Sequence, residues 1–314
     1  MLRSPRNPRR VVFPIVVALL AASAAGPAWS QAAINCSSEL YGVTQNGSLF
    51  RTNINTAAAM VLGATQVNLS EIAWDNATNT LWATDGSTGS MLRKLNPSTG
   101  AQMSAVSFGS GAINGLEFVG GVLYGTWIPS TGGGAPSSFV TINTATGALT
   151  TIGATGITAP ISGLAYDSSS STMYGVTAGG GGLSALVRIN MATGAATFIG
   201  STGYFKVGSI EIGPDGNLYG GVAQDGAISP SGLLRINKAT GVATLIGLTN
   251  FSIVGLAACQ SGSAPPILGP TIPVNAPWAI GLTALMLFAA GAWTLARRRR
   301  EPRVRRGAAW PRKD

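Results

Sequence analysis

The sequence predicts an all-β fold, a five-bladed β-propeller with four strands per blade, and two repeated markers lead to it. The first is Asn-x-x-Thr-Gly, which recurs every 47 residues at Asn96, Asn143, Asn190 and Asn237, with a diverged first copy expected to begin at Asn55. The second is an aliphatic, an aromatic and a small residue in succession. Its aromatic positions are Tyr41, Trp82, Tyr124, Tyr174 and Tyr219. Five repeats of roughly 40 to 50 residues are typical of propellers.

Each unit supplies four short runs rich in β-branched and aromatic residues, separated by turn residues and lacking a helical period. Runs such as Ile161 to Asp167 are expected to be innermost, followed by the Leu-Tyr-Gly, Leu-x-Arg-Ile-Asn and Ala-Thr-x-Ile-Gly runs. We expect the recurring aromatic column to fill the space between blades. A β-solenoid is less favoured because its repeats are usually shorter, and a sandwich would need no five-fold repeat.

The two ends of the repeat region should complete each other in a composite closing blade. The first Leu-Tyr-Gly run, at Leu40, has no inner strand before it, and the last inner strand, Val254 to Cys259, has no second strand after it. Cys36 and Cys259 would then lie close together, and we expect a disulfide between them. Closing so long a loop would stabilise the fold by roughly 5 kcal/mol.

The remaining segments divide the chain into an exported domain and its flanks. Residues 1–30 have the basic region, apolar run and small-residue site of a signal peptide, although an uncleaved anchor is the alternative. We expect the propeller over residues 31–260, a Pro, Gly and Ser linker over 261–277, a transmembrane helix over 278–296 and a basic cytoplasmic tail over 297–314.

Composition excludes several functions. The formal net charge is +9, yet residues 31–263 hold seven basic and nine acidic side chains, so the positive charge belongs to the ends. A nucleic-acid partner is therefore not expected. The chain has no histidine, which excludes histidine-dependent triads, histidine-ligated zinc and histidine general bases.

Two groups of residues are candidate binding sites. The long second-to-third and outer-to-inner connections share one rim, which is expected to gather Trp127, Tyr204, Phe205, Lys206, Asp225 and Phe251. Aromatic rings beside polar groups suit a carbohydrate or peptide ligand, whereas the simpler interpretation is that these side chains cover loop cores.

The second group lies on the inner strands. Glu117 and Glu211 occupy a column that holds alanine in the other copies, and Glu71 lies two residues earlier, on the same face of its strand. Carboxylates that converge on a channel could hold a calcium ion, although a wet channel mouth accommodates them without a ligand. We expect no other cofactor.

The C-terminus resembles the sorting tails of bacterial exosortase substrates, the PEP-CTERM class and its IPTL-CTERM relative. The likeness rests on Ile272-Pro273, Trp278, the apolar run and the cluster Arg297, Arg298, Arg299 and Arg300, although Val274-Asn275-Ala276 replaces the usual Thr-Leu-Ser. The resemblance implies a Gram-negative envelope protein whose tail anchors it in the membrane or is processed by an exosortase-type enzyme, which leaves it at the surface or outside the cell.

Together these features predict an exported, non-enzymatic module that binds ligands or has a structural role at the cell surface. Its partners would be the membrane, through the C-terminal helix, the sorting enzyme, and an extracellular polysaccharide or another surface protein. The alternative is an envelope hydrolase or lyase that uses carboxylates of the rim or channel. No acid and base pair stands out in the sequence to support it.

Overall fold

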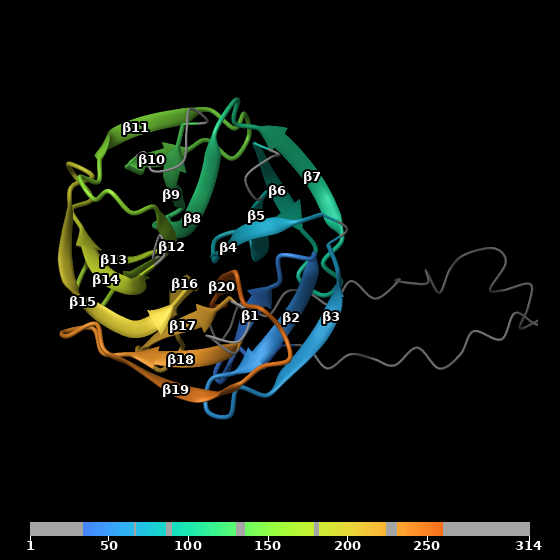
Figure 1. Ribbon diagram of the computed structural model, residues 1–314. Coiled ribbons are helices and arrows are strands. Elements are labelled where there is room, and N and C mark those ends of the chain that lie inside the picture. Colours follow the sequence, from blue (N-terminus) through green and yellow to red (C-terminus); the bar gives the residue numbers. More distant parts are fainter. Residues whose placement is uncertain are drawn as a thin grey trace, which may run out of the picture. The chain divides into compact units, whose positions relative to one another are not determined.

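The protein is a five-bladed β-propeller. The computed structural model describes residues 34–65, 67–85, 90–129, 136–178, 182–223 and 231–259. Their strands form five four-stranded antiparallel sheets arranged in a ring (Figure 1). The predicted fold class, strand number and strand order within each blade are confirmed. The predicted signal peptide, linker, helix 278–296 and basic tail lie outside the described residues.

Every blade has an inner, a second, a third and an outer strand. The inner strands are β4 (Leu69–Asp75), β8 (Ala112–Val119), β12 (Ile161–Asp167), β16 (Val207–Ile212) and β20 (Gly255–Ala257). The second strands are β5 (Thr80–Asp85), β9 (Val122–Ile128), β13 (Thr172–Thr177), β17 (Leu218–Val222) and β1 (Glu39–Val43). The third strands are β6 (Met91–Leu95), β10 (Ser138–Ile142), β14 (Leu183–Ile189), β18 (Gly232–Ile236) and β2 (Ser48–Asn53). The outer strands are β7 (Gln102–Ser107), β11 (Leu149–Ala154), β15 (Ala196–Phe205), β19 (Ala243–Leu248) and β3 (Ala59–Ala64).

We number the blades by these strands. Blades 1 to 4 contain β4–β7, β8–β11, β12–β15 and β16–β19, and the closing blade contains β20, β1, β2 and β3. Within the described ranges, no helix is long and apolar enough to cross a membrane.

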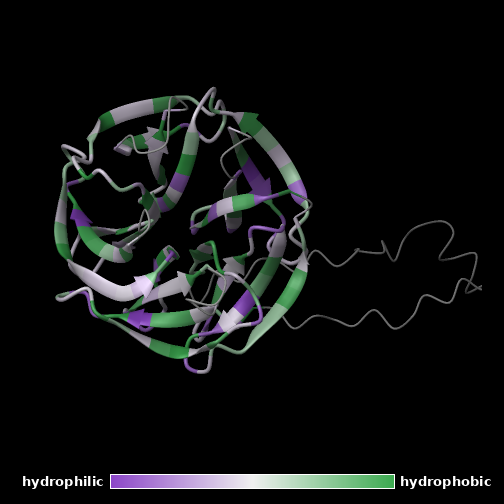
Figure 2. Ribbon diagram, in the orientation of Figure 1, coloured by the Kyte–Doolittle hydropathy of each residue, from purple (hydrophilic) through white to green (hydrophobic). Residues whose placement is uncertain are grey.

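The core consists of the spaces between neighbouring blades. Figure 2 shows apolar residues along the strands of every blade. Five apolar clusters each join two adjacent blades, and each cluster includes one member of the aromatic column. Tyr41 of the closing blade, for example, stacks on Trp74 of blade 1 with 5.4 Å between ring centroids. The predicted packing of the aromatic column between blades is confirmed.

The Asn-x-x-Thr-Gly marker forms the turn between the third and outer strands. In the copy that begins at Asn96, the Asn96 side chain accepts a hydrogen bond from the backbone N–H of Ser98 (2.9 Å), and Gly100 has a positive φ of 73°. Asparagine side chains readily stabilise such turns, and glycine adopts a positive φ without steric cost. These two requirements explain the first and last residues of the marker.

The first copy of this turn begins at Asn53, so the prediction of Asn55 is wrong. The Asn53 side chain accepts a hydrogen bond from the N–H of Asn55 (2.9 Å). Ala57 occupies the glycine position with a φ of 58°. The marker is hard to see in the sequence because an alanine adopts the backbone conformation that glycine has in the other copies.

The Asn-x-x-Thr-Gly turns also pack against the neighbouring blades. In four of the five blades, a glycine of the outer strand lies against the backbone carbonyl of the marker threonine in the next blade. The pairs are Gly63 with Thr99, Gly153 with Thr193, Gly200 with Thr240 and Gly247 with Thr56. A Cβ atom at any of these glycines would collide with that carbonyl oxygen. The outer-strand glycine and the turn threonine therefore recur together in the repeat because they form one contact.

We expect Gly200→Ala to lower the free energy of unfolding by about 2 kcal/mol, because the new methyl group must push the Thr240 carbonyl and its turn away from blade 3. Urea unfolding followed by tryptophan fluorescence measures the change. Thr197→Ala, at an exposed position of the same strand, is the matched control and should change the stability by less than about 0.5 kcal/mol. Equal effects of the two substitutions would contradict the proposed contact.

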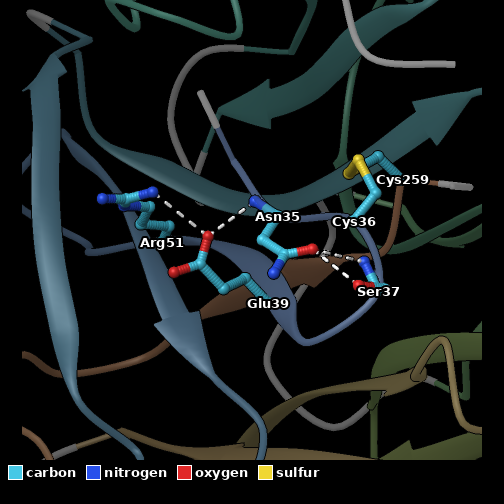
Figure 3. The surroundings of a disulfide bond; sticks show 6 residues. All are labelled: Asn35, Cys36, Ser37, Glu39, Arg51 and Cys259. Atoms are coloured by element: carbon cyan, nitrogen blue, oxygen red, sulfur yellow. Dashed lines mark hydrogen bonds and ion pairs between the residues drawn. A yellow bond between two sulfur atoms is a disulfide. The ribbon is translucent and has the colours of Figure 1, made fainter. Parts of the chain in front are cut away.

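The two ends of the propeller region close the ring as predicted. β20 pairs with β1, with Ala257 opposite Tyr41, and a disulfide joins Cys36 to Cys259 across 223 residues (Figure 3). The two Cα atoms are 5.2 Å apart. Next to the disulfide, Glu39 accepts a hydrogen bond from the N–H of Asn35 (2.7 Å) and forms an ion pair with Arg51 (3.2 Å). The segment that leads into β1 is thus held both covalently and by polar contacts.

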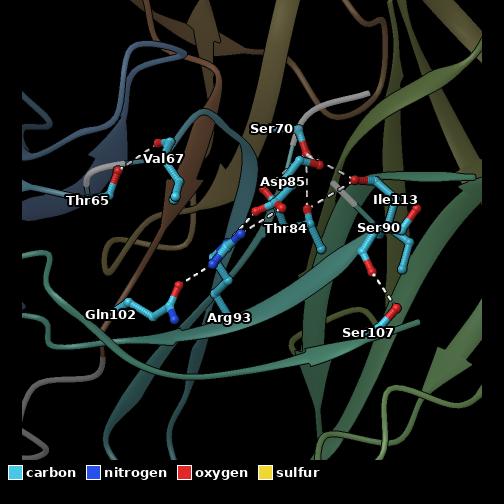
Figure 4. A network of polar contacts seen from close by, with 10 residues as sticks. All are labelled: Thr65, Val67, Ser70, Thr84, Asp85, Ser90, Arg93, Gln102, Ser107 and Ile113. Atoms are coloured by element: carbon cyan, nitrogen blue, oxygen red, sulfur yellow. Dashed lines mark hydrogen bonds and ion pairs between the residues drawn. The ribbon is translucent and has the colours of Figure 1, made fainter. Parts of the chain in front are cut away.

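Polar side chains also join the blades near the start of three inner strands, β8, β12 and β16. The hydroxyls of Ser70 and Thr84 both donate to the carbonyl of Ile113 in the next blade, each at 3.0 Å (Figure 4). The same kind of link recurs from Thr126 to Ile161 (2.9 Å) and from Ser162 to Val207 (3.0 Å). Buried carbonyls at the free edge of the inner strands thereby find donors, which is the usual requirement for buried backbone groups.

Candidate functional site

A cavity of about 520 Å³ opens where the inner strands end. We call it the mouth cavity. Its acidic lining residues are Glu117, Asp167 and Glu211, its aromatic ones are Trp74, Phe118 and Tyr166, and turn residues together with Cys259 complete the wall. Because the strands of each blade alternate in direction, this mouth lies on the rim of the inner-to-second turns. The rim with the long connections is on the opposite side.

Aspartates stabilise the turns around the mouth. Asp75, Asp167 and Asp215 each accept a hydrogen bond from the backbone N–H two residues later, at 2.9, 3.0 and 3.2 Å. This is the Asx-turn geometry that aspartate favours. Such turns are short, so they leave the end of the channel open.

The inner strands lie close together in one layer below the mouth. Gly115, Gly163 and Gly255 occupy equivalent positions there, and Ser209 and Glu71 complete the layer. A Cβ atom on Gly163 would lie 2.7 Å from the Cα atom of Ser209. The channel is therefore narrow at this glycine layer. The cavity lies beyond it, towards the column two residues later along each inner strand, which holds alanine or glutamate.

Glu71 lies within this layer and joins three blades. Its side chain is fully buried, and Oε1 accepts hydrogen bonds from the Ser209 hydroxyl (2.8 Å) and from the backbone N–H groups of Ile72 (3.0 Å) and Leu256 (3.2 Å). Ser209 in turn accepts from Leu256 (2.9 Å). Oε2 has no hydrogen-bond partner among the described residues. Glu71 thus connects blade 1, blade 4 and the closing blade within the glycine layer.

Glu117 and Glu211, which share one column of the repeat, both line the mouth cavity. Glu211 is buried and accepts a hydrogen bond from the N–H of Ile212 (2.7 Å), whereas Glu117 is half-buried. Among the described residues, neither carboxylate forms an ion pair. They differ in this respect from Asp167, whose carboxylate contacts Lys238 Nζ at 2.6 Å.

Burial determines the protonation of the three glutamates. It raises the pKa of Glu211 to about 8, although the N–H groups of Ile212 and Ala258 act in the opposite direction. Burial likewise raises the pKa of Glu117, and the charges of Glu211 and Glu71 raise it further. For Glu71, burial raises the pKa more than its hydrogen bonds lower it. The glutamates therefore retain protons near neutral pH unless a cation approaches them.

Asp167 behaves in the opposite way. Burial alone would raise its pKa, but the hydrogen bonds from Lys238 and Ser169 outweigh this effect and hold the pKa far below its ordinary value. Asp167 therefore contributes a permanent charge that Lys238 already balances.

Calcium binding by Glu71, Glu117 and Glu211 stays a prediction. In the part of the chain that the structure describes, no three acidic or cysteine side chains are grouped closely enough to hold a metal ion. Glu71 belongs to the glycine layer, two residues before the column of Glu117 and Glu211. This offset separates it from that column by roughly 7 Å along the strand direction.

The predicted aromatic rim lies on the opposite side of the propeller, and three of its rings pack against the protein. Trp127 donates from its indole nitrogen to the carbonyl of Ser110 (2.9 Å), and Phe251 stacks on Phe50 with 5.4 Å between centroids. Tyr204 packs against the cluster between blades 3 and 4. These contacts favour the interpretation that the rings cover loop cores. Phe205 is half-buried and Lys206 is exposed, whereas Asp225 lies outside the described residues.

The residues that we did not predict are the aromatic ones of the mouth cavity. They are Trp74, Phe118 and Tyr166, and each stands one residue before the last residue of its inner strand, β4, β8 or β12. Aligning the inner strands would have revealed this column, but an aromatic column in a strand is equally expected in a core. Only the position of the column at the end of the channel distinguishes the two.

Comparisons with known proteins give only distant matches. No protein family and no curated protein matches the sequence. Similar solved structures include the nidogen–laminin complex, with 15% identity, a TM-score of 0.47, and coverage of 70% of this chain and 80% of that one. A gluconolactonase from Xanthomonas campestris has 11% identity, a TM-score of 0.46, and coverage of 71% and 80%. TolB from Acinetobacter baumannii has 13% identity, a TM-score of 0.43, and coverage of 70% and 55%.

Proposed function

We propose that this protein is a non-catalytic binding module of the cell surface and that its ligand occupies the mouth cavity. The observation that carries the proposal is the cavity itself. Its volume of about 520 Å³ lies within the range typical of small-molecule sites, and its lining combines aromatic rings with carboxyl groups. Rings beside polar groups suit the apolar faces and hydroxyls of a sugar, so an extracellular polysaccharide is the ligand class that we favour.

The cellular setting of the proposal follows from the disulfide and the sequence flanks. Disulfides persist in exported proteins, and the one between Cys36 and Cys259 closes the propeller. With the predicted signal peptide and C-terminal tail, this supports an envelope protein that is anchored in the membrane or transferred to the surface by an exosortase-type enzyme. Calcium at the channel glutamates would be compatible with such a module, but the proposal does not require it.

A glycan array probed with the mature exported protein tests the proposal. We expect binding that Tyr166→Ala weakens at least about tenfold, since an aromatic contact with a ligand contributes roughly 1 to 3 kcal/mol when both groups are desolvated. Trp127→Ala, on the opposite rim, is the matched control and should leave the affinity unchanged. Thermal unfolding of both variants confirms that they are folded.

Three results would contradict the proposal. Loss of binding in Trp127→Ala but not in Tyr166→Ala would place the ligand on the opposite rim. Absence of binding to any glycan would exclude the polysaccharide class. Cleavage of a bound glycan that disappears in Glu211→Gln would show a hydrolase or lyase instead of a binding module.

A further inference from the structure

The mouth cavity has acidic groups that no protein cation balances. The described residues that line it include three carboxyl groups and no lysine or arginine. Asp167 is balanced from outside the cavity by Lys238, which also donates to the carbonyl of Gly216 (3.0 Å). Glu117 and Glu211 have no ion pair within the described part of the chain. A positively charged ligand group would therefore find two carboxyl groups that have no counter-ion from the described protein and that can give up their protons when a cation approaches.

A second observation concerns hydrogen-bond donors and is independent of the acidic residues. Trp74 lines the cavity and is only 4% exposed, yet its indole N–H has no acceptor among the described residues. Buried indole N–H groups normally have a partner, and a missing one costs about 1 to 3 kcal/mol. A ligand oxygen placed against this wall would supply the acceptor.

We infer that the mouth cavity binds a sugar that carries a free, protonated amino group. The ammonium group would lie between Glu117 and Glu211, and a sugar hydroxyl would accept the hydrogen bond of Trp74. The faces of Tyr166 and Phe118 would contact the ring and add a cation–π attraction. The inference rests on the proposed binding function and names its ligand class.

The observations favour this ligand over a bare metal ion. A cavity of about 520 Å³ far exceeds the space that one ion requires, and the described acidic side chains form no three-membered metal cluster. A metal ion would also leave the Trp74 donor unpaired, because it offers no acceptor. A simple amine without hydroxyls has the same defect, so the combination of one cationic donor with several acceptors indicates an amino sugar.

The test compares two oligosaccharides that differ only in the amino group, the tetramers of glucosamine and of N-acetylglucosamine. Isothermal titration calorimetry at pH 6 uses the mature protein with its disulfide intact. We expect the free-amine tetramer to bind at least about tenfold more tightly. The double substitution Glu117→Gln and Glu211→Gln should abolish this preference while retaining binding of the acetylated tetramer, because glutamine keeps the side-chain size but cannot give up a proton to pair with the ammonium group.

Asp75→Asn is the matched control. It exchanges a carboxylate for an amide on the same rim. Asp75 is not among the residues that line the cavity, and asparagine keeps the side-chain oxygen that accepts from the N–H of Ala77. The preference for the free amine should persist in this variant. If the double glutamine variant does not fold, the comparison of the two tetramers on the wild-type protein still decides the question.

The other outcomes overturn the inference in distinguishable ways. Equal affinity for both tetramers would exclude the amino group as the recognised feature and leave the proposed binding function intact. The same conclusion would follow if neither tetramer bound but other glycans did, provided that Tyr166→Ala weakened their binding. Failure of every glycan to bind would overturn both proposals. Stabilisation of the wild type by calcium chloride, absent in the double variant, would assign the carboxylates to a metal ion.

Discussion

Replacing both cysteines by serine is expected to lower the free energy of unfolding by about 5 kcal/mol, the largest effect of any substitution pair considered. The disulfide closes a loop of 223 residues, and a crosslink of this span greatly restricts the unfolded chain. It also holds the segment before β1 against the end of β20, where the ring closes through the pairing of only three residues. Without the crosslink, separation of β20 from the closing blade would free that chain segment and gain conformational entropy.

Urea unfolding of the oxidised wild type and the Cys36→Ser, Cys259→Ser double variant measures this effect. The reduced wild type is the matched control, and its unfolding midpoint should agree with that of the variant. Because the cysteines are only 6% and 1% exposed, reduction must be carried out under denaturing conditions before refolding. A loss of less than about 1 kcal/mol would mean that the strand pairing alone closes the ring.

The second large effect is a loss of stability as the pH rises from 5 to 8. An unfolded glutamate releases its proton near pH 4.3, whereas Glu211 in the folded protein retains its proton up to a pKa of about 8. Between these values the folded state binds more protons than the unfolded state, so the free energy of unfolding decreases with rising pH. Each such group contributes up to about 1.4 kcal/mol per pH unit. Glu71 and Glu117 act in the same direction because burial raises their pKa values as well.

Asp167 limits stability on the acidic side. Its pKa is lowered in the folded state, so the stability that it contributes is present above the unfolded value near 3.9 and is lost as the pH falls through lower values. The two tendencies place maximal stability near pH 4 to 5, which is below the optimum of most proteins.

Thermal unfolding at pH 5 and at pH 8 checks this prediction. We expect the wild type to lose about 2 kcal/mol or more over this range, a decrease in Tm of roughly 4 to 8 °C. Glu211→Gln should have a visibly flatter profile, since the amide cannot titrate and its oxygen can still accept from Ile212. Asp75→Asn should follow the wild-type profile. A wild-type profile that is flat or that rises towards pH 8 would contradict the assigned protonation.

Several features of the fold were predictable because they repeat. Strand order, aromatic packing and the composite closing blade follow from five copies of one pattern, since each copy must contact its neighbours in the same way. The first turn was missed because its sequence departs from the repeat. Ala57 replaces glycine in the turn, and the Asn53 side chain forms its hydrogen bond where the sequence pattern favoured Asn55.

The candidate site was predicted only in part. A shared column identified Glu117 and Glu211 as equivalent residues of two inner strands, and both line the mouth cavity because such positions surround one axis. For the aromatic rings of the opposite rim the sequence left two interpretations open, ligand binding and the covering of loop cores, and the packing of Trp127 and Phe251 favours the second. Local sequence cannot distinguish a ring that covers a loop from one that faces a ligand.

The sequence by itself determined the number of blades, the strand order, the closing disulfide and the exclusion of histidine chemistry, because these depend on residue types and their spacing along the chain. Only the tertiary structure decided which end of the channel holds a cavity and which glutamates lack a counter-charge. Both depend on distances between different blades. The inner strands approach one another at the glycine layer, and Lys238 reaches Asp167 but not Glu117 or Glu211.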